Sequence, residues 1–300
     1  MNPSTDRKGL PGQALRLDSP AGPLALRMSG SGAPLLLVHS INAAPSMAEV
    51  APIHHHFEGT RCVFSLDLPG FGASDRSDRA YTPRLMTDAL HAATQEIRRR
   101  CGPAPIDALA LSLSCEFLAR AAIEQPSHFR SLGLVSPTGF NGRGDKRGPA
   151  GSTMAIPWLM HLLRASGAWP ALFRTLTRPS VIRYFLRKTF GSSEIDDELF
   201  EQAVQQARVA GAMHAPLYFL TGALFSRDIH TLYDDLRCPV WMCHGVRGDF
   251  TDYRQKSRLQ GKANWHFSVM QTGALPHFEK PDEFFHQYSQ FLCASANLSR

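Results

Sequence analysis

One serine stands where its hydroxyl could act as a nucleophile. Ser112 closes the apolar run 106–111 and opens the Ala/Leu-rich segment 113–125. A serine hydroxyl attacks at neutral pH only if a base removes its proton and a carboxylate orients that base. Ala110 and Ser114 flank it in a G-x-S-x-G-like pattern, in which small residues let a strand turn sharply into a helix. We therefore examine Ser112 as a candidate nucleophile.

The elements that would hold Ser112 follow from the hydrophobic pattern. Eight short runs are expected to be strands: 13–17, 24–28, 34–40, 62–68, 106–112, 131–137, 239–245 and 266–272. Helical patterns lie at 83–100, 113–125, 252–260 and 281–295. Strands that alternate with helices predict an α/β fold with a mostly parallel sheet flanked by helices. The continuously apolar middle strands fit burial on both faces.

One long segment interrupts this alternation. Residues 139–237 carry helical, aromatic-rich stretches and no strand signal, and they open with the glycine-rich, charged linker 139–149. The pattern predicts an inserted helical cap at 139–237. The core would then consist of residues 1–138 and 238–300.

Four motifs make the chain resemble the α/β-hydrolase family. LLLVHSINAAPS (35–46) resembles the loop after the family's third strand, and DLPGFGASD (67–75) its D-x-P-G-x-G-x-S loop. HGVRGD (244–249) and FEKPDEFF (278–285) are similar to its late acid and C-terminal segments. The resemblance implies an eight-stranded α/β-hydrolase core with an inserted cap and a serine nucleophile. It implies neither a metal nor an organic cofactor.

The same resemblance implies roles for further residues. The family's chain order is serine, acid, histidine. Asp249 is the preferred acid because Gly248 gives it a tight turn after a predicted strand, and Asp252 is its competitor. The backbone N–H groups of Ile41 and Leu113 would form an oxyanion hole for a tetrahedral intermediate.

The histidine departs furthest from the family pattern. Where the family has Gly-His, this chain has Gly273-Ala274. His277 lies three positions later, and no other histidine lies between the last predicted strand and the last predicted helix. We expect His277 to be the base. The alternative is a structural His277 in a protein whose triad is incomplete.

Two other groups of histidines are expected to have no catalytic part. His39 is interpreted as a structural residue that braces its loop. His54, His55 and His56 are consecutive, so on a helix they diverge by about 100° each and cannot converge on one metal. We expect these three on the surface.

The composition of the cap suggests the substrate class. Residues 142–190 hold nine cations and only one acid, Asp145, among many large apolar residues. An apolar pocket between cap and core would suit a hydrophobic ester, thioester or related acyl compound. The overall plan resembles the meta-cleavage-product C–C hydrolases and related esterases. An acyltransferase on the same site and a catalytically silent ligand-binding protein remain alternatives.

Charge and hydropathy limit the kinds of partner that the chain is expected to have. The net charge is +6 and the pI about 9.1, yet no nucleic-acid-binding module is recognisable, so a small molecule is the expected partner. No apolar run is long enough to span a membrane, and the first residues lack the apolar core of a secretory signal. We expect a cytoplasmic protein without stable membrane insertion. A homodimer is left open.

Overall fold

The computed structural model describes residues 10–142 and 144–298, and these form one eight-stranded sheet in the order β1-β2-β4-β3-β5-β6-β7-β8. The strands are β1 (Gln13–Leu17), β2 (Leu24–Ser29), β3 (Pro34–Val38), β4 (Cys62–Asp67), β5 (Ile106–Leu111), β6 (Phe129–Val135), β7 (Val240–Gly245) and β8 (Trp265–Met270). Strand β2 pairs antiparallel with β1 and β4, and all pairs from β4 to β8 are parallel. The predicted fold class is confirmed.

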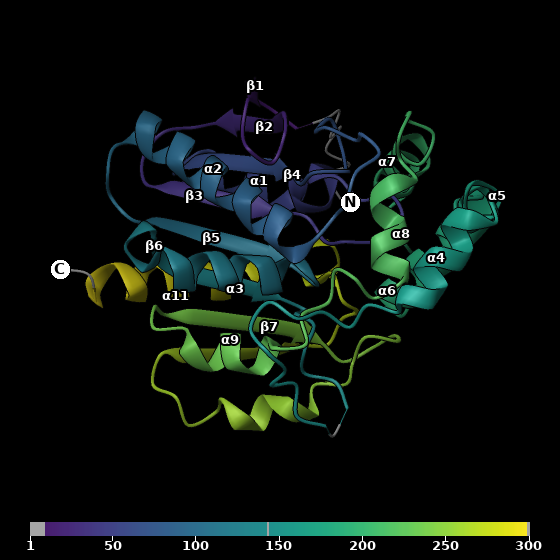
Figure 1. Cartoon of the computed structure of the whole chain (residues 1–300). Coiled ribbons are helices and arrows are strands. Elements are labelled where there is room, and N and C mark those ends of the chain that lie inside the picture. The colour runs from purple at the N-terminus through teal and green to yellow at the C-terminus, as the bar shows by residue number, and fades with distance from the viewer. Residues whose placement is uncertain (1–9, 143, 299–300) are drawn as a thin grey trace.

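Helices cover both faces of the sheet. These are α1 (Ala51–Phe57) and α11 (Pro281–Leu298) on one face, and α2 (Pro83–Cys101), α3 (Ser114–Glu124) and α9 (Ile229–Asp235) on the other. Figure 1 shows α3 in front of the sheet and α11 behind it. Successive residues of a strand point to opposite faces, so Leu36 and Val38 pack against α2 and α3 while Leu35 and Leu37 pack against α1 and α11. This explains why the central strands are apolar throughout.

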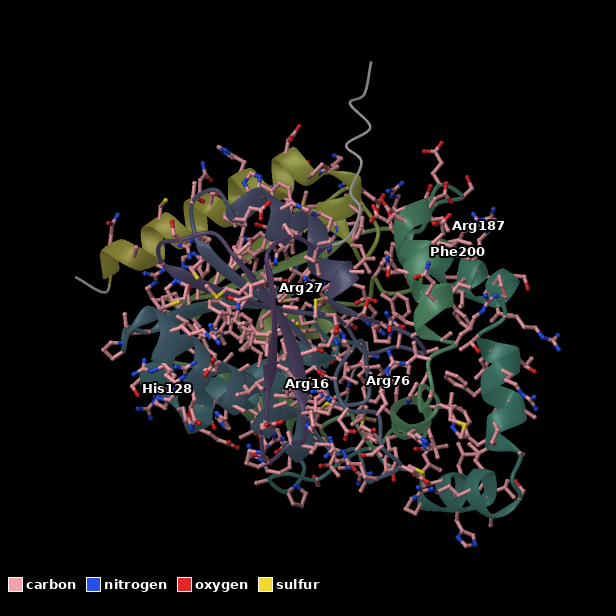
Figure 2. All side chains as sticks on the ribbon, turned by 90° about the horizontal axis from the view of Figure 1, so that it is seen from above. Arg16, Arg27, Arg76, His128, Arg187 and Phe200 are labelled. Carbon is pink, nitrogen blue, oxygen red and sulfur yellow. The ribbon has the colours of Figure 1, made fainter. Side chains whose placement is uncertain are left out.

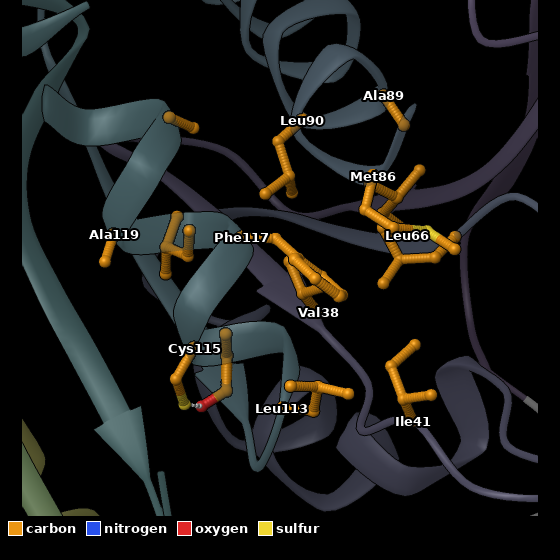
Figure 3. Close-up of a cluster of buried hydrophobic side chains, with 14 of the residues drawn as sticks. Val38, Ile41, Leu66, Met86, Ala89, Leu90, Leu113, Cys115, Phe117 and Ala119 are labelled. Atoms are coloured by element: carbon orange, nitrogen blue, oxygen red, sulfur yellow. Dashed lines mark hydrogen bonds between the residues drawn. The ribbon is translucent and has the colours of Figure 1, made fainter. Parts of the chain in front are cut away.

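The layer between the sheet and α2 and α3 fixes the helix that follows Ser112. Figure 3 shows Phe117 of α3 and Leu90 and Met86 of α2 directed at Val38 and Leu66 of the sheet. All five side chains are fully buried. Burial of each large apolar side chain contributes about 1.5–3 kcal/mol. The start of α3 is therefore held rigidly above the end of β5.

Helices α4 to α8 follow β6 and precede α9 along the chain, and they lie beside the sheet. They are α4 (Pro157–Ala165), α5 (Trp169–Leu176), α6 (Pro179–Phe190), α7 (Asp197–Gln206) and α8 (His214–Leu220). In Figure 1, α7 and α8 lie nearer the sheet, and α4 and α5 lie at the outer edge. The predicted cap also includes α9, which packs on α3 at the face of the sheet. The boundary at residue 237 stays a prediction.

Two local expectations were wrong. The segment expected as a helix at 252–260 forms the short 3-10 helix η3 (Arg254–Arg258), a run of polar residues with no apolar face to pack. His54 is buried rather than on the surface, because its Nδ1 and Nε2 atoms each lie 2.7 Å from a serine hydroxyl, of Ser65 and Ser29 respectively. Burial lowers the pKa of His54 to about 4.

Three more short elements complete the fold. They are the 3-10 helices η1 (Met47–Val50) and η2 (Pro126–His128) and the single turn α10 (Pro276–Glu279). Within the described residues, no helix combines the length and the hydropathy needed to cross a bilayer.

Candidate functional site

Ser112 occupies a strained turn between β5 and α3. Its φ of 52° lies in the left-handed region, which only one other described non-glycine residue, Ser136, also adopts. Such a backbone costs on the order of 1 kcal/mol or more and persists only where the surroundings impose it. The Ser112 N–H donates to Val135 O at 2.9 Å, and the Cys115 N–H donates to Ser112 O at 3.1 Å. Within the described chain, the Ser112 hydroxyl has no hydrogen-bond partner.

The predicted oxyanion-hole residues flank this turn. Ile41 and Leu113 are buried, and their backbone N–H groups donate to no other described residue. The two loops are joined where the Ser114 hydroxyl donates to His39 O at 2.6 Å. Leu113 also precedes the first turn of α3, where helix N–H groups favour negative charge. Both uncommitted donors thus belong to two loops that the hydrogen bond from Ser114 to His39 joins, one of which carries Ser112.

The loop that carries Ile41 is held in place by a buried carboxylate. The Ser40 N–H donates to Glu49 Oε2 at 2.8 Å, and Asn42 Nδ2 donates to Glu49 Oε1 at 2.7 Å. His39 braces the same loop. Its Nδ1 lies 2.6 Å from Ser40 O, and its Nε2 accepts the Leu68 N–H at 3.0 Å, which confirms the structural interpretation of His39.

The two candidate acids differ in how they are engaged. Asp249 is 56% exposed, and one cation, Lys188 Nζ, lies 3.3 Å from its Oδ1. Asp252 accepts two hydrogen bonds from the Arg254 guanidinium and one from the Gly142 N–H at 2.9 Å. These bonds hold the pKa of Asp252 well below its usual range. Asp252 is therefore committed to fixing the linker, and Asp249 is the carboxylate with capacity left.

Ala274 is the residue that the sequence resemblance aligns with the family's histidine. Its N–H donates to Thr189 O at 2.7 Å, and its carbonyl accepts the Ser136 hydroxyl at 2.8 Å. Lys188 precedes Thr189 on α6, and its carbonyl accepts the Asp249 N–H at 3.3 Å. The end of α6 thus brings together the two loops that carry Asp249 and Ala274.

His277 lies in the interior, on α10. It is 0% exposed, and its Nε2 lies 2.8 Å from the carbonyl oxygen of Glu49. A carbonyl only accepts, so Nε2 carries the proton of this bond. Among the described residues no hydrogen bond joins Ser112, Asp249 and His277 to one another. The catalytic role of His277 stays a prediction, and in this arrangement His277 supports η1 and, through Glu49, the loop of Ile41.

Sequence reasoning overlooked Glu116, one turn beyond Ser112. The Thr138 hydroxyl donates to Glu116 Oε1, and the Ser226 N–H donates to Oε2 at 2.8 Å. Burial raises the pKa of Glu116 to about 7. An acid in the first turn of an otherwise apolar helix start was the available signal, because buried carboxylates need partners. Glu116 thus joins α3 both to the segment just after β6 and to the segment between α8 and α9.

A cleft of about 220 Å³ lies beside α1. It is bordered by η1 and α1 on one side and α7 on the other, with Met47, Asp67, Asp196 and Leu199 among its walls. Ser112 is not among the residues that line it.

Comparisons with known proteins agree with this architecture. The model of the alpha/beta hydrolase family matches residues 35–287. No curated protein sequence matches the chain. A thermophilic esterase from Thermogutta terrifontis is similar over 95% of this chain and 99% of its own, with TM-score 0.70 and 18% identity. A serine hydrolase involved in carbazole degradation is similar over 94% and 99%, with TM-score 0.72 and 13% identity.

An epoxide hydrolase from Acinetobacter nosocomialis is similar over 93% of this chain and 88% of its own, with TM-score 0.72 and 18% identity. At such identities the likeness shows the fold alone, and that fold hosts several reactions. The family match spans most of the chain, from β3 into α11, and agrees with the strained serine turn. The chain therefore belongs to the alpha/beta hydrolase family.

Proposed function

We propose that the protein is a serine hydrolase that cleaves an ester, thioester or related acyl bond of a hydrophobic small molecule. The observation that carries the proposal is the Ser112 turn, which holds a non-glycine residue at φ 52° and leaves its hydroxyl without a partner among the described residues. Strain of this kind without a structural use for the side chain is typical of a nucleophile.

The chemistry would proceed through an acyl-enzyme. Ser112 Oγ attacks the carbonyl carbon while its proton passes to the base, and a tetrahedral intermediate forms. The N–H groups of Ile41 and Leu113 would donate to its oxyanion. Collapse expels the leaving group with that proton, and water then releases the acyl group from Ser112. The uncommitted state of both N–H groups supports this assignment.

The proposed base and acid are His277 and Asp249. Since Nε2 of His277 donates to Glu49 O, the nitrogen that would accept the Ser112 proton is Nδ1, and a hydrogen bond between Nδ1 and Ser112 Oγ would have to form for the reaction. Ala274 supports a second candidate function, a catalytically silent ligand-binding protein, because the position next to the strained loops carries no ionisable group. The two functions predict different behaviour toward an acylating or phosphonylating probe.

A fluorophosphonate probe tests the nucleophile. We expect it to label the wild type and not Ser112→Ala. Ser136→Ala is the matched control, because Ser136 has the same backbone strain but a hydroxyl already bonded to Ala274 O. Labelling of Ser136→Ala with loss in Ser112→Ala supports the proposal. A folded wild type that takes up no label would favour the silent protein.

Paired variants test the base and the acid against one activated ester. If His277 is the base, His277→Ala loses most of the rate while Ala274→His gains none. If His277 only supports the loop of Ile41, Ala274→His raises the rate and His277→Ala mainly lowers the melting temperature. Asp249→Asn should lower turnover more than Asp252→Asn, and equal losses would remove the preference for Asp249.

A further inference from the structure

The large apolar side chains that the protein exposes are concentrated in the helical insertion. Eleven such side chains occur among the described residues, and eight of them belong to residues 139–237: Met154, Ile156, Trp158, Leu162, Tyr184, Phe185, Val209 and Leu220. Scattered exposed apolar residues are ordinary, but a local concentration marks a surface that something covers.

Five of these residues belong to α4 or to the segments next to its start, and we call them the cap patch: Met154, Ile156, Trp158, Leu162 and Leu220. Trp158 and Leu162 are one turn apart on α4, so they lie on the same side of the helix. The Ile156 N–H donates to Thr221 O at 2.8 Å, which brings Leu220 next to the start of α4. Trp158 is 68% exposed and Leu162 is 53% exposed.

The segment that begins at the cap patch is purely basic. Residues 157–190, which form α4, α5 and α6, contain six cations and no acid: Arg164, Arg174, Arg178, Arg183, Arg187 and Lys188. Within the described chain, Arg174, Arg178 and Arg187 take part in no ion pair. The exposed Tyr184 and Phe185 belong to the same segment. Figure 1 places α4 and α5 at the edge farthest from the sheet, and Figure 2 shows Arg187 on the insertion, away from the sheet.

An exposed tryptophan and leucine, in the same segment as three arginines outside any described ion pair, match the chemistry of an anionic lipid surface. Apolar side chains enter the boundary between headgroups and acyl chains, and guanidinium groups bind phosphates. Charge complementarity thus selects this occupant over a neutral surface, and no described helix could span the bilayer. We propose that the cap patch docks the protein on an anionic membrane, with Trp158 and Leu162 inserted and Arg174, Arg178 and Arg187 at the phosphates. This docking does not depend on Ser112 chemistry.

Trp158 supplies its own probe. The other three tryptophans, Trp169, Trp241 and Trp265, are at most 5% exposed, so a change in emission on binding reports Trp158. With vesicles of phosphatidylcholine and phosphatidylglycerol in equal parts, we expect the emission to shift to shorter wavelength and brominated acyl chains to quench it. Vesicles of phosphatidylcholine alone should give neither effect. Trp158→Phe should remove the signal while the protein still sediments with the anionic vesicles.

Variants separate the apolar from the charged contribution. Replacing both Trp158 and Leu162 by Ser should weaken vesicle sedimentation by about tenfold or more. Phe250→Ser, an exposed aromatic of the core, is the matched control and should not weaken it. Replacing Arg174, Arg178 and Arg187 by Gln should abolish the preference for anionic vesicles, and added salt should do the same to the wild type.

Three outcomes would overturn the docking proposal. They are equal binding by the Trp158 and Leu162 double variant, equal binding to both kinds of vesicle, and an emission shift that follows protein concentration without vesicles, which would show a second copy covering the patch. Ser112→Ala should sediment like the wild type. A wild type that binds the anionic vesicles but neither hydrolyses an activated ester nor takes up the fluorophosphonate would therefore overturn only the proposed function.

Discussion

The ends of β5 and β6 are neighbours in the sheet, and both end in a strained serine. Ser112 has φ 52° and Ser136 has φ 47°. The Ser136 hydroxyl is spent on Ala274 O, and two residues later Thr138 is bonded to Glu116. The Ser112 hydroxyl has no such partner in the described chain. At the end of β6 the strained serine holds another loop by a hydrogen bond. At the end of β5 the strained serine keeps its hydroxyl available.

The largest expected effect separates the two serines by activity. Ser112→Ala should lower turnover of an activated ester by about three orders of magnitude or more, because the nucleophile and its partners act as a unit. Ser136→Ala should retain activity within about tenfold, since its hydroxyl is already hydrogen-bonded. Steady-state kinetics of both purified variants measures this. Comparable activity of Ser112→Ala and the wild type would show that Ser112, like Ser136, is not the nucleophile.

The next effect concerns the bond that ties the β6 end to α3. With a pKa raised to about 7 from its usual 4.5, Glu116 retains a proton in the folded protein that the unfolded chain has lost. Stability from this group is fully present below about pH 4.5 and is lost as the pH rises toward about 7, on the order of 3 kcal/mol. Glu116→Gln should remove that loss.

Urea unfolding of the wild type and Glu116→Gln at about pH 5 and about pH 8 measures the difference. The stability advantage of the glutamine variant should grow with pH. A difference that stays constant across this range would mean that Glu116 ionises normally, and the β6 end would then be held by other contacts.

A smaller effect isolates the hydrogen bond of Ser136. Ser136→Ala leaves the Ala274 carbonyl without its donor and should lower the free energy of unfolding by about 1 kcal/mol. Ser112→Ala removes no bond within the described chain and should leave stability almost unchanged. Equal losses in denaturant unfolding would show that the Ser112 hydroxyl also has a structural use.

The smallest effect compares glycine at both positions. Glycine relieves the positive φ but gives the unfolded chain more freedom, so Ser112→Gly should change stability by no more than about 0.5 kcal/mol. Ser136→Gly has the same two opposing backbone effects, and it also loses the hydrogen bond to Ala274 O. It should therefore be less stable than Ser112→Gly by about 1 kcal/mol. An opposite order in thermal unfolding would contradict the comparison.

Local patterns predicted the sheet well because the apolar residues within each strand indicate on their own that the strand is buried. The run 13–17 is β1 as predicted, and the predicted strand 24–28 lies within β2. The turn at 67–75 also follows local chemistry, since the Asp67 carboxylate accepts the Ala73 N–H within the turn. An acceptor side chain at that position therefore stabilises the turn.

Contacts between distant segments could not be predicted from the sequence. His54 is buried because Ser29 and Ser65 come from two different strands, and no local pattern at 54–56 contains them. The bond from His277 to Glu49 likewise spans most of the chain. Candidate catalytic residues were identified by type and motif, but whether they meet depends on such long-range contacts.

The docked end of α6 also constrains the order in which the chain can mature during synthesis. A Cβ at Gly248 would lie 2.3 Å from Lys188 O, and one at Gly273 would lie 2.3 Å from Phe190 O, so α6 rests directly on these two backbones. Both glycines leave the ribosome well after α6 does. The helix can form early, but its last carbonyls must stay hydrated until the loops after β7 and β8 are made. A nascent chain arrested before residue 273 would therefore present an undocked α6 to proteases and chaperones.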